Sequence, residues 1–171
     1  MDFGNMTQKA QDALRASQVK AIRYGHQQVD GEHLLLALLE QDGGLVPRII
    51  ERLGADVASF KARLEQILEQ RPRVSGGATE SGKVYVTQRL NALLVAAGDS
   101  AKKLKDEYVS VEHLLLGFIA EGRKSEAGKL LAEFAITRNR ALAVRRHVRG
   151  PQRVPTDTPE RGYEAFAQYA T

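Results

Sequence analysis

The sequence repeats itself at a fixed distance of 80 residues. Without a gap, residues 7–41 align with residues 87–121 and are identical at 11 of 35 positions. The longest shared piece, Glu-His-Leu-Leu-Leu, begins at Glu32 and again at Glu112. Such a self-match is typical of a duplicated supersecondary unit, since one unit alone cannot bury its apolar face. The duplication therefore predicts two similar units packed as one globular domain.

Each copy has the sequence pattern of four helices. Residues that favour helix N-caps precede runs in which apolar residues recur at helical spacing. The run Leu34–Leu39 is apolar nearly all round, so the second helix is expected at the centre. Because only Val84–Val86 resembles a strand, we expect an all-α fold of about eight helices. The expected helix starts are Thr7, Asp30, Gly43-Gly44 and Asp56 in the first copy, and Thr87, Ser110, Ser125 and Thr137 in the second.

The duplication also divides the chain into segments. We assign residues 1–70 to the first repeat, 71–86 to a linker rich in glycine and serine, and 87–150 to the second repeat. Residues 151–171 are expected to begin a second linker.

The composition argues against several classes of protein. The chain has no cysteine, which removes disulfides, thiolate metal sites and thiol catalysis. Its longest apolar run covers residues 34–39, well short of the ~20 residues that a membrane-spanning helix needs. The N-terminus shows no apolar signal segment, and we expect a cytoplasmic protein. The net charge of +4 is modest for a dedicated nucleic-acid-binding protein.

One stretch, GATESGKV at residues 77–84, nearly matches a phosphate-binding loop. Its two glycines and Lys83 have the right spacing, but Val84 stands where the motif needs serine or threonine. No strand precedes the stretch, and the next expected helix cap is Thr87, too far along to hold a phosphate. We therefore interpret the stretch as linker and expect neither ATP nor another cofactor to bind this chain.

Two further patterns have a chemical alternative. Glu32-His33 and Glu112-His113 each resemble half of an HExxH zinc helix, but positions 37 and 117 hold alanine and glycine. We interpret each imidazole as a local hydrogen-bonding group and expect no metal. The stretch 138–153 is rich in arginine but has no aromatic residue for base stacking, so a solvated helix face is favoured over nucleic-acid binding. No catalytic arrangement of side chains stands out, and we expect no enzyme.

The duplicated T-Q…V-x-x-EHLLLALL pattern resembles the Clp N-terminal repeat, which precedes the ATPase modules of Clp-type AAA+ unfoldases. The likeness covers residues 1–150. VRGPQRV at 148–154 and TPERGYEAFAQY at 158–169 resemble the segment that leads into the first ATPase module in the disaggregase branch. The resemblance implies a non-catalytic substrate-recognition domain, tethered above a homohexameric ring that uses ATP and Mg²⁺. Such domains take up exposed apolar segments of unfolded or aggregated proteins.

The resemblance also implies substrate-binding positions in an apolar groove between the repeats. Several of these positions have a structural reading too, as a helix cap, a turn, a helix-dipole partner or plain core. A second hypothesis is docking of a folded adaptor protein, as in other branches of the family. We expect neither a membrane nor a nucleic acid as partner. The implied positions are Thr7, Leu93, Leu94, Asp106, Glu112 and His113.

Overall fold

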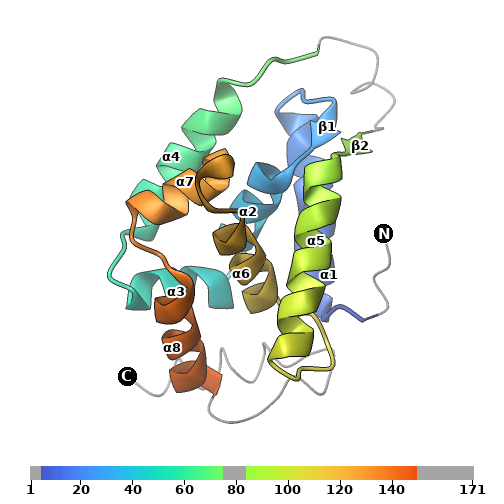
Figure 1. Cartoon of the computed structure of the whole chain (residues 1–171). Helices are drawn as coiled ribbons and strands as arrows, with labels where there is room; N and C mark the ends of the chain where they lie inside the picture. Colours follow the sequence, from blue (N-terminus) through green and yellow to red (C-terminus); the bar gives the residue numbers. More distant parts are fainter. Residues whose placement is uncertain (1–4, 75–83, 150–171) are drawn as a thin grey trace.

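The computed structural model describes residues 5–74 and 84–149, except for the side chains of residues 148 and 149. Within these residues the chain forms eight α-helices, one 3-10 turn and two short strands, which confirms the expected all-α fold (Figure 1). The near phosphate loop lies outside the described residues except for Val84, and the tail 151–171 lies outside them entirely. The elements are α1 (Gln8–Arg23), β1 (Gln28–Val29), α2 (Gly31–Leu39), α3 (Leu45–Arg52), α4 (Val57–Glu69), β2 (Tyr85–Val86), α5 (Gln88–Lys103), α6 (Val111–Glu121), the 3-10 turn (Gly122–Lys124), α7 (Glu126–Glu133) and α8 (Arg138–Arg149).

The helices begin where the sequence predicts. The hydroxyl of Thr7 accepts a hydrogen bond from the third residue of α1, and the hydroxyl of Thr87 does the same for α5. Asp56 and Ser125 cap α4 and α7 through their side chains. Each such bond satisfies one of the backbone N–H groups that have no partner within a helix.

The second helix of each repeat lies at the centre of the domain. Figure 1 shows α2 and α6 between the α1–α5 side of the molecule and the side formed by α3, α4, α7 and α8. Every residue of α2 is buried, and so is α6 from Val111 to Phe118. This follows from sequences that are apolar nearly all round, because such a helix is stable only when it is covered on every face. No helix among the described residues is both long and apolar enough to cross a membrane.

Short strand contacts join the two repeats to each other. β1 pairs in parallel with β2, with Val29 opposite Val86, and an isolated bridge pairs Met6 with Val109. In both cases the residue before the N-cap of the first helix of one repeat pairs with the residue before the N-cap of the second helix of the other repeat. The sequence pattern predicted no strands, because two-residue strands are too short to show an alternating pattern. The repeats are therefore interlocked through backbone hydrogen bonds as well as through side chains.

Candidate functional site

A network of charged side chains holds the repeats together at the start of α2. Glu32 is fully buried, and its carboxylate accepts hydrogen bonds from both terminal nitrogens of Arg89 at 2.6 and 2.7 Å. Arg71 donates to the same carboxylate at 2.5 Å, and the backbone N–H of Ala127 donates at 2.9 Å. Arg89 also reaches Glu121 at the end of α6 at 2.8 Å. These contacts form the inter-repeat network, which joins α2 of the first repeat to α5, α6 and α7 of the second.

The charge of Glu32 is fixed by its partners. Burial alone would raise the pKa of this carboxyl, but the hydrogen bonds and positive charges of Arg89 and Arg71 outweigh burial and lower its pKa to about 2. The pKa of each arginine is in turn raised by the carboxylate, against the effect of burial. The sequence draws attention to Glu32 as part of a Glu-His pair, and its main role is in this ion network.

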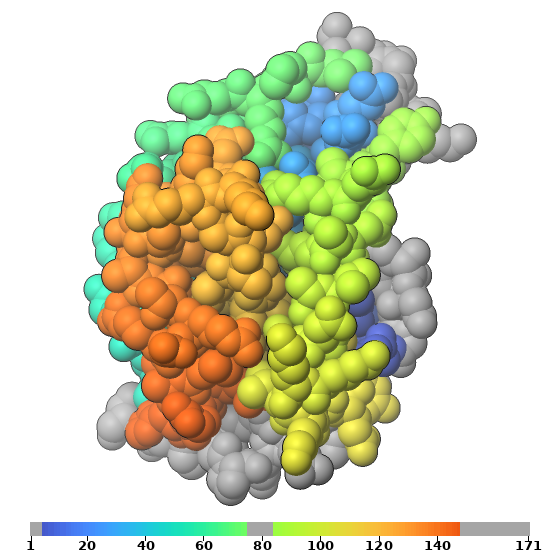
Figure 2. Space-filling model, viewed as in Figure 1, coloured from blue at the N-terminus to red at the C-terminus, as the bar shows by residue number. Residues whose placement is uncertain are grey.

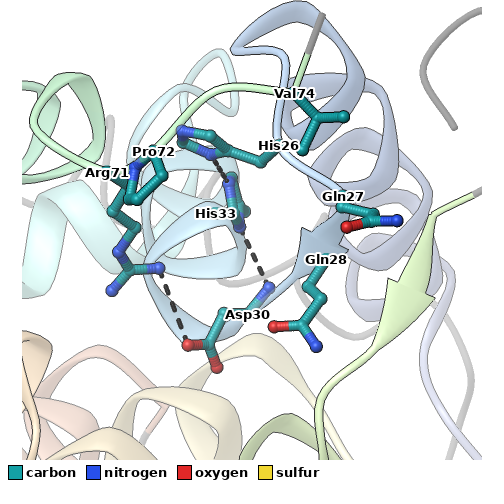
Figure 3. A pocket seen from close by; sticks show the side chains of 8 residues that line it. All are labelled: His26, Gln27, Gln28, Asp30, His33, Arg71, Pro72 and Val74. Carbon is teal, nitrogen blue, oxygen red and sulfur yellow. Dashed lines mark hydrogen bonds and ion pairs between the residues drawn. The ribbon is translucent and has the colours of Figure 1, made fainter. Parts of the chain in front are cut away.

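A hydrogen-bonded chain of two histidines caps α2 (Figure 3). The backbone N–H of Asp30 donates to Nδ1 of His33 at 2.9 Å, so that nitrogen carries no proton in the neutral ring. The proton of His33 is then on Nε2. This nitrogen donates a hydrogen bond to Nδ1 of His26 at 2.8 Å. Burial, His26 and the nearby charge of Arg71 lower the pKa of His33 to about 4. Both rings are therefore neutral at pH 7.

The histidine pair lines a cavity of about 570 Å³ between β1, the start of α2 and the Arg71-Pro72 segment (Figure 3). Most of its central polar groups are engaged inside the protein, although Nε2 of His26 is buried without a hydrogen-bond partner. His33 bonds Asp30 and His26, while Arg71 lies against Asp30 and Glu32. These contacts show that the side chains of the cavity wall stabilise the fold. We assign no ligand to the cavity.

The second repeat holds an equivalent cluster with different chemistry. At the start of α6 the backbone N–H of Ser110 donates to Nδ1 of His113 at 2.8 Å, as in the first repeat. The Nε2 atom of His113 lies 2.8 Å from Asp106, which occupies the position equivalent to His26. Arg145 of α8 donates to Asp106, and its Nε lies 2.8 Å from Oε2 of Glu112 without the geometry of a hydrogen bond. Both histidines thus cap their helices through local hydrogen bonds, as the sequence indicates.

The same cluster has the composition of a metal site. Ligand atoms of Asp106, Glu112 and His113 lie within 4.8 Å of one another, the only such group in the described part of the chain. Arg145 supplies the positive charge to both carboxylates. The arrangement is therefore accounted for by an internal ion pair.

Most of the predicted substrate-binding residues lie in the interior. Five of the six are buried, and Leu94 alone is partly exposed. Thr7 caps α1 and its N–H bonds the carbonyl of Val109, Leu93 is core, and the three polar residues belong to the Arg145 cluster. Nothing in their geometry tests binding, so their role stays a prediction.

The outer face of α5 is a further candidate, of which only Leu94 is among the predicted substrate-binding residues. From Leu90 to Gly98 this helix carries no charged side chain. Asn91 is the one polar residue of this stretch, and we call the others that reach the surface the α5 strip: Ala92, Leu94, Val95, Ala96 and Gly98. Val95 is 66% exposed, the most exposed of the large apolar side chains in the described residues. The space-filling view shows α5, in yellow-green, along one face of the molecule (Figure 2).

The two repeats differ in this strip, and the difference could have been found from the sequence. Positions 12 and 15 of α1 are Asp12 and Arg15, whereas the equivalent positions of α5 are Ala92 and Val95. A surface helix normally carries charges on its outer face. Their absence from one copy of a duplicated helix is a signal for an interaction surface.

Comparison with known proteins places the fold in a family. The Clp repeat (R) N-terminal domain matches residues 5–134. The chain belongs to the Clp repeat N-terminal domain family. Chaperone protein ClpB of Nitratidesulfovibrio vulgaris is 46% identical over 169 residues, which is 99% of this chain and 20% of that protein. ClpB of Bacillus anthracis is 42% identical over 169 residues, 99% of this chain and 19% of that protein. The chain thus spans about a fifth of the length of these relatives.

Solved structures show the same fold at lower identity. The Hsp104 N-terminal domain from Candida albicans superposes with a TM-score of 0.75 at 16% identity, covering 91% of this chain and 99% of that one. The N-terminal domain of the ClpV1 ATPase from E. coli gives a TM-score of 0.72 at 22% identity, with 91% of each chain covered. The Clp repeat fold that the family resemblance implied is confirmed.

Proposed function

We propose that this domain binds exposed apolar segments of unfolded or aggregated polypeptides, as the non-catalytic recognition domain of a ClpB-type chaperone. The observation that carries the proposal is the α5 strip, where Val95 is exposed within an uncharged helix face. Family membership supports it, because the curated relatives are chaperones. Unfolded proteins expose apolar side chains that folded proteins hide, so an apolar surface recognises them without reading a defined sequence.

The size of the strip implies weak binding by one domain. Burying one Val or Leu side chain contributes about 1.5–3 kcal/mol, and association loses translational and rotational freedom. Six domains on a cytoplasmic hexameric ring, powered by the ATPase modules of the parent chain, would act together and raise the effective affinity. A weak single site suits a chaperone that must also release its client.

A charge placed in the strip tests the proposal. Val95→Glu is expected to weaken binding of fluorescently labelled unfolded casein at least fivefold in anisotropy titrations, because the carboxylate must lose water to contact an apolar segment. Val19→Glu is the matched control: Val19 is also an exposed valine, at 46%, but lies on α1. It is expected to change binding less than twofold. Equal affinity of Val95→Glu and wild type would contradict the proposal, and a preference for one folded partner over casein would favour adaptor docking.

A further inference from the structure

The last helix, α8, is held more weakly than its counterpart in the first repeat. Counted from the helix N-caps Asp56 and Thr137, Ala141 and Arg145 of α8 correspond to Phe60 and Leu64 of α4. All four residues are buried, but α8 buries one small and one charged side chain where α4 buries two large apolar ones. Among the described side chains of α8, only Ala141 and Arg145 are buried. Apolar packing therefore contributes much less to the docking of α8 than to that of α4.

Charged and polar contacts hold α8 in place instead. The side chain of Arg145 is 8% exposed and pairs with Asp106 and Glu112, whose side chains are 0% and 3% exposed. Arg140 donates to the backbone carbonyls of Leu53 and Ala135. Through these bonds, and by packing on α3 and α6, α8 closes over the two carboxylates.

Contacts of this kind favour reversible release. When α8 leaves, the guanidinium and both carboxylates regain water, which offsets much of the lost ion pairing. A helix that buries large apolar side chains has no such compensation. Elements with few buried apolar contacts open locally, well before the whole domain unfolds.

We infer that α8 is a releasable helix latched by Arg145, and that its release uncovers Asp106, Glu112 and the faces of α3 and α6 beneath it. This inference does not depend on the proposed client binding. It assigns Arg145 as the residue that keeps the buried carboxylates closed to solvent. The helix that is released, α8, is the one that residues 150–171 follow in the sequence.

Amide hydrogen exchange of the 171-residue chain, followed by mass spectrometry, tests the latch. In the wild type, α8 amides should exchange at least tenfold faster than α4 amides. Arg145→Met keeps an unbranched apolar stem but removes the positive charge that faces the two carboxylates, and it should speed exchange of α8 at least a further tenfold while α4 is unchanged. Arg146→Met, on the exposed side of the same helix, should change exchange less than twofold.

Two results would overturn the inference. One is equal exchange of α8 and α4 in the wild type, which would mean that α8 opens only when the domain unfolds. The other is an Arg145→Met protein in which α8 keeps its wild-type protection. The wild-type measurement decides the matter even if Arg145→Met does not fold.

Discussion

Replacing Glu32 with alanine is expected to lower the free energy of unfolding by about 3–5 kcal/mol. The change leaves Arg89 and Arg71 without the buried carboxylate that both contact, and it removes the acceptor of the Ala127 N–H. Both arginines keep other carboxylate partners, but each lost hydrogen bond to a charged group contributes about 1.5–3 kcal/mol, more than a lost surface pair. Urea denaturation followed by circular dichroism measures the change, and the midpoint should move without a large change in slope.

Glu126→Ala is the matched control for this prediction. Glu126 touches the same Arg71 at 3.3 Å, but its side chain is 53% exposed. An exposed pair contributes about 0–1 kcal/mol, so this variant should stay close to wild type. A loss of less than about 1 kcal/mol in Glu32→Ala would mean that the inter-repeat network does not hold the repeats together.

Acidification from pH 6.5 to pH 4 is expected to remove about 2–3 kcal/mol of stability through His33. The ordinary pKa of histidine is 6.5, and burial together with His26 and Arg71 lowers the pKa of His33 to about 4 in the folded protein. Between these values the unfolded chain binds a proton that the folded chain does not. Stability therefore falls as pH falls through this window.

The variant His33→Gln should flatten the stability profile in this pH range. Glutamine is the usual residue at the third helical position of a capping box, so it can accept the Asp30 N–H without titrating. His147→Gln, which changes an exposed ring on α8, is the control and should keep the wild-type profile. Equilibrium unfolding at several pH values makes the comparison. An unchanged slope in His33→Gln would show that the acid sensitivity arises elsewhere.

The two acid effects occupy different ranges of pH. The pKa of Glu32 is lowered from 4.5 to about 2, so its contribution is present above pH 4.5 and is lost as pH falls toward 2. Loss of stability above pH 4.5 is therefore assigned to the histidine pair, and loss below it includes the inter-repeat network.

Local features of the sequence predicted the helices well. Caps such as Thr7 and Thr87 act within three residues, and the apolar run of α2 shows its burial directly. The duplication then gave the number of helices and their grouping. These signals work because helix caps and helical periodicity depend on residues close together in the chain.

The ion networks could not be read from the sequence in the same way. Arg89 lies 57 residues from Glu32, and Ala127 lies 95 residues from it, so no local pattern connects them. Arg145 was interpreted as part of a solvated face, but it is buried because Asp106, 39 residues away, faces it. Only the repeat comparison offers a hint, since the positions equivalent to Asp106 and Arg145 are His26 and Leu64, so a charged pair replaces an uncharged one.

The burial of the predicted substrate-binding residues could not be read from the local sequence either. A resemblance can name positions such as Asp106 and Glu112, but burial depends on which helix covers them. The exposed face of α5 depends only on one helix and its charges, so it could have been read from the sequence.

The most direct test of the account is an NMR titration of the isotope-labelled chain with unfolded casein. The account predicts concentration-dependent shifts of amide signals concentrated at residues 90–98 of α5, with α4 and its surroundings unaffected. Shifts that leave residues 90–98 unchanged at high casein concentration would contradict it.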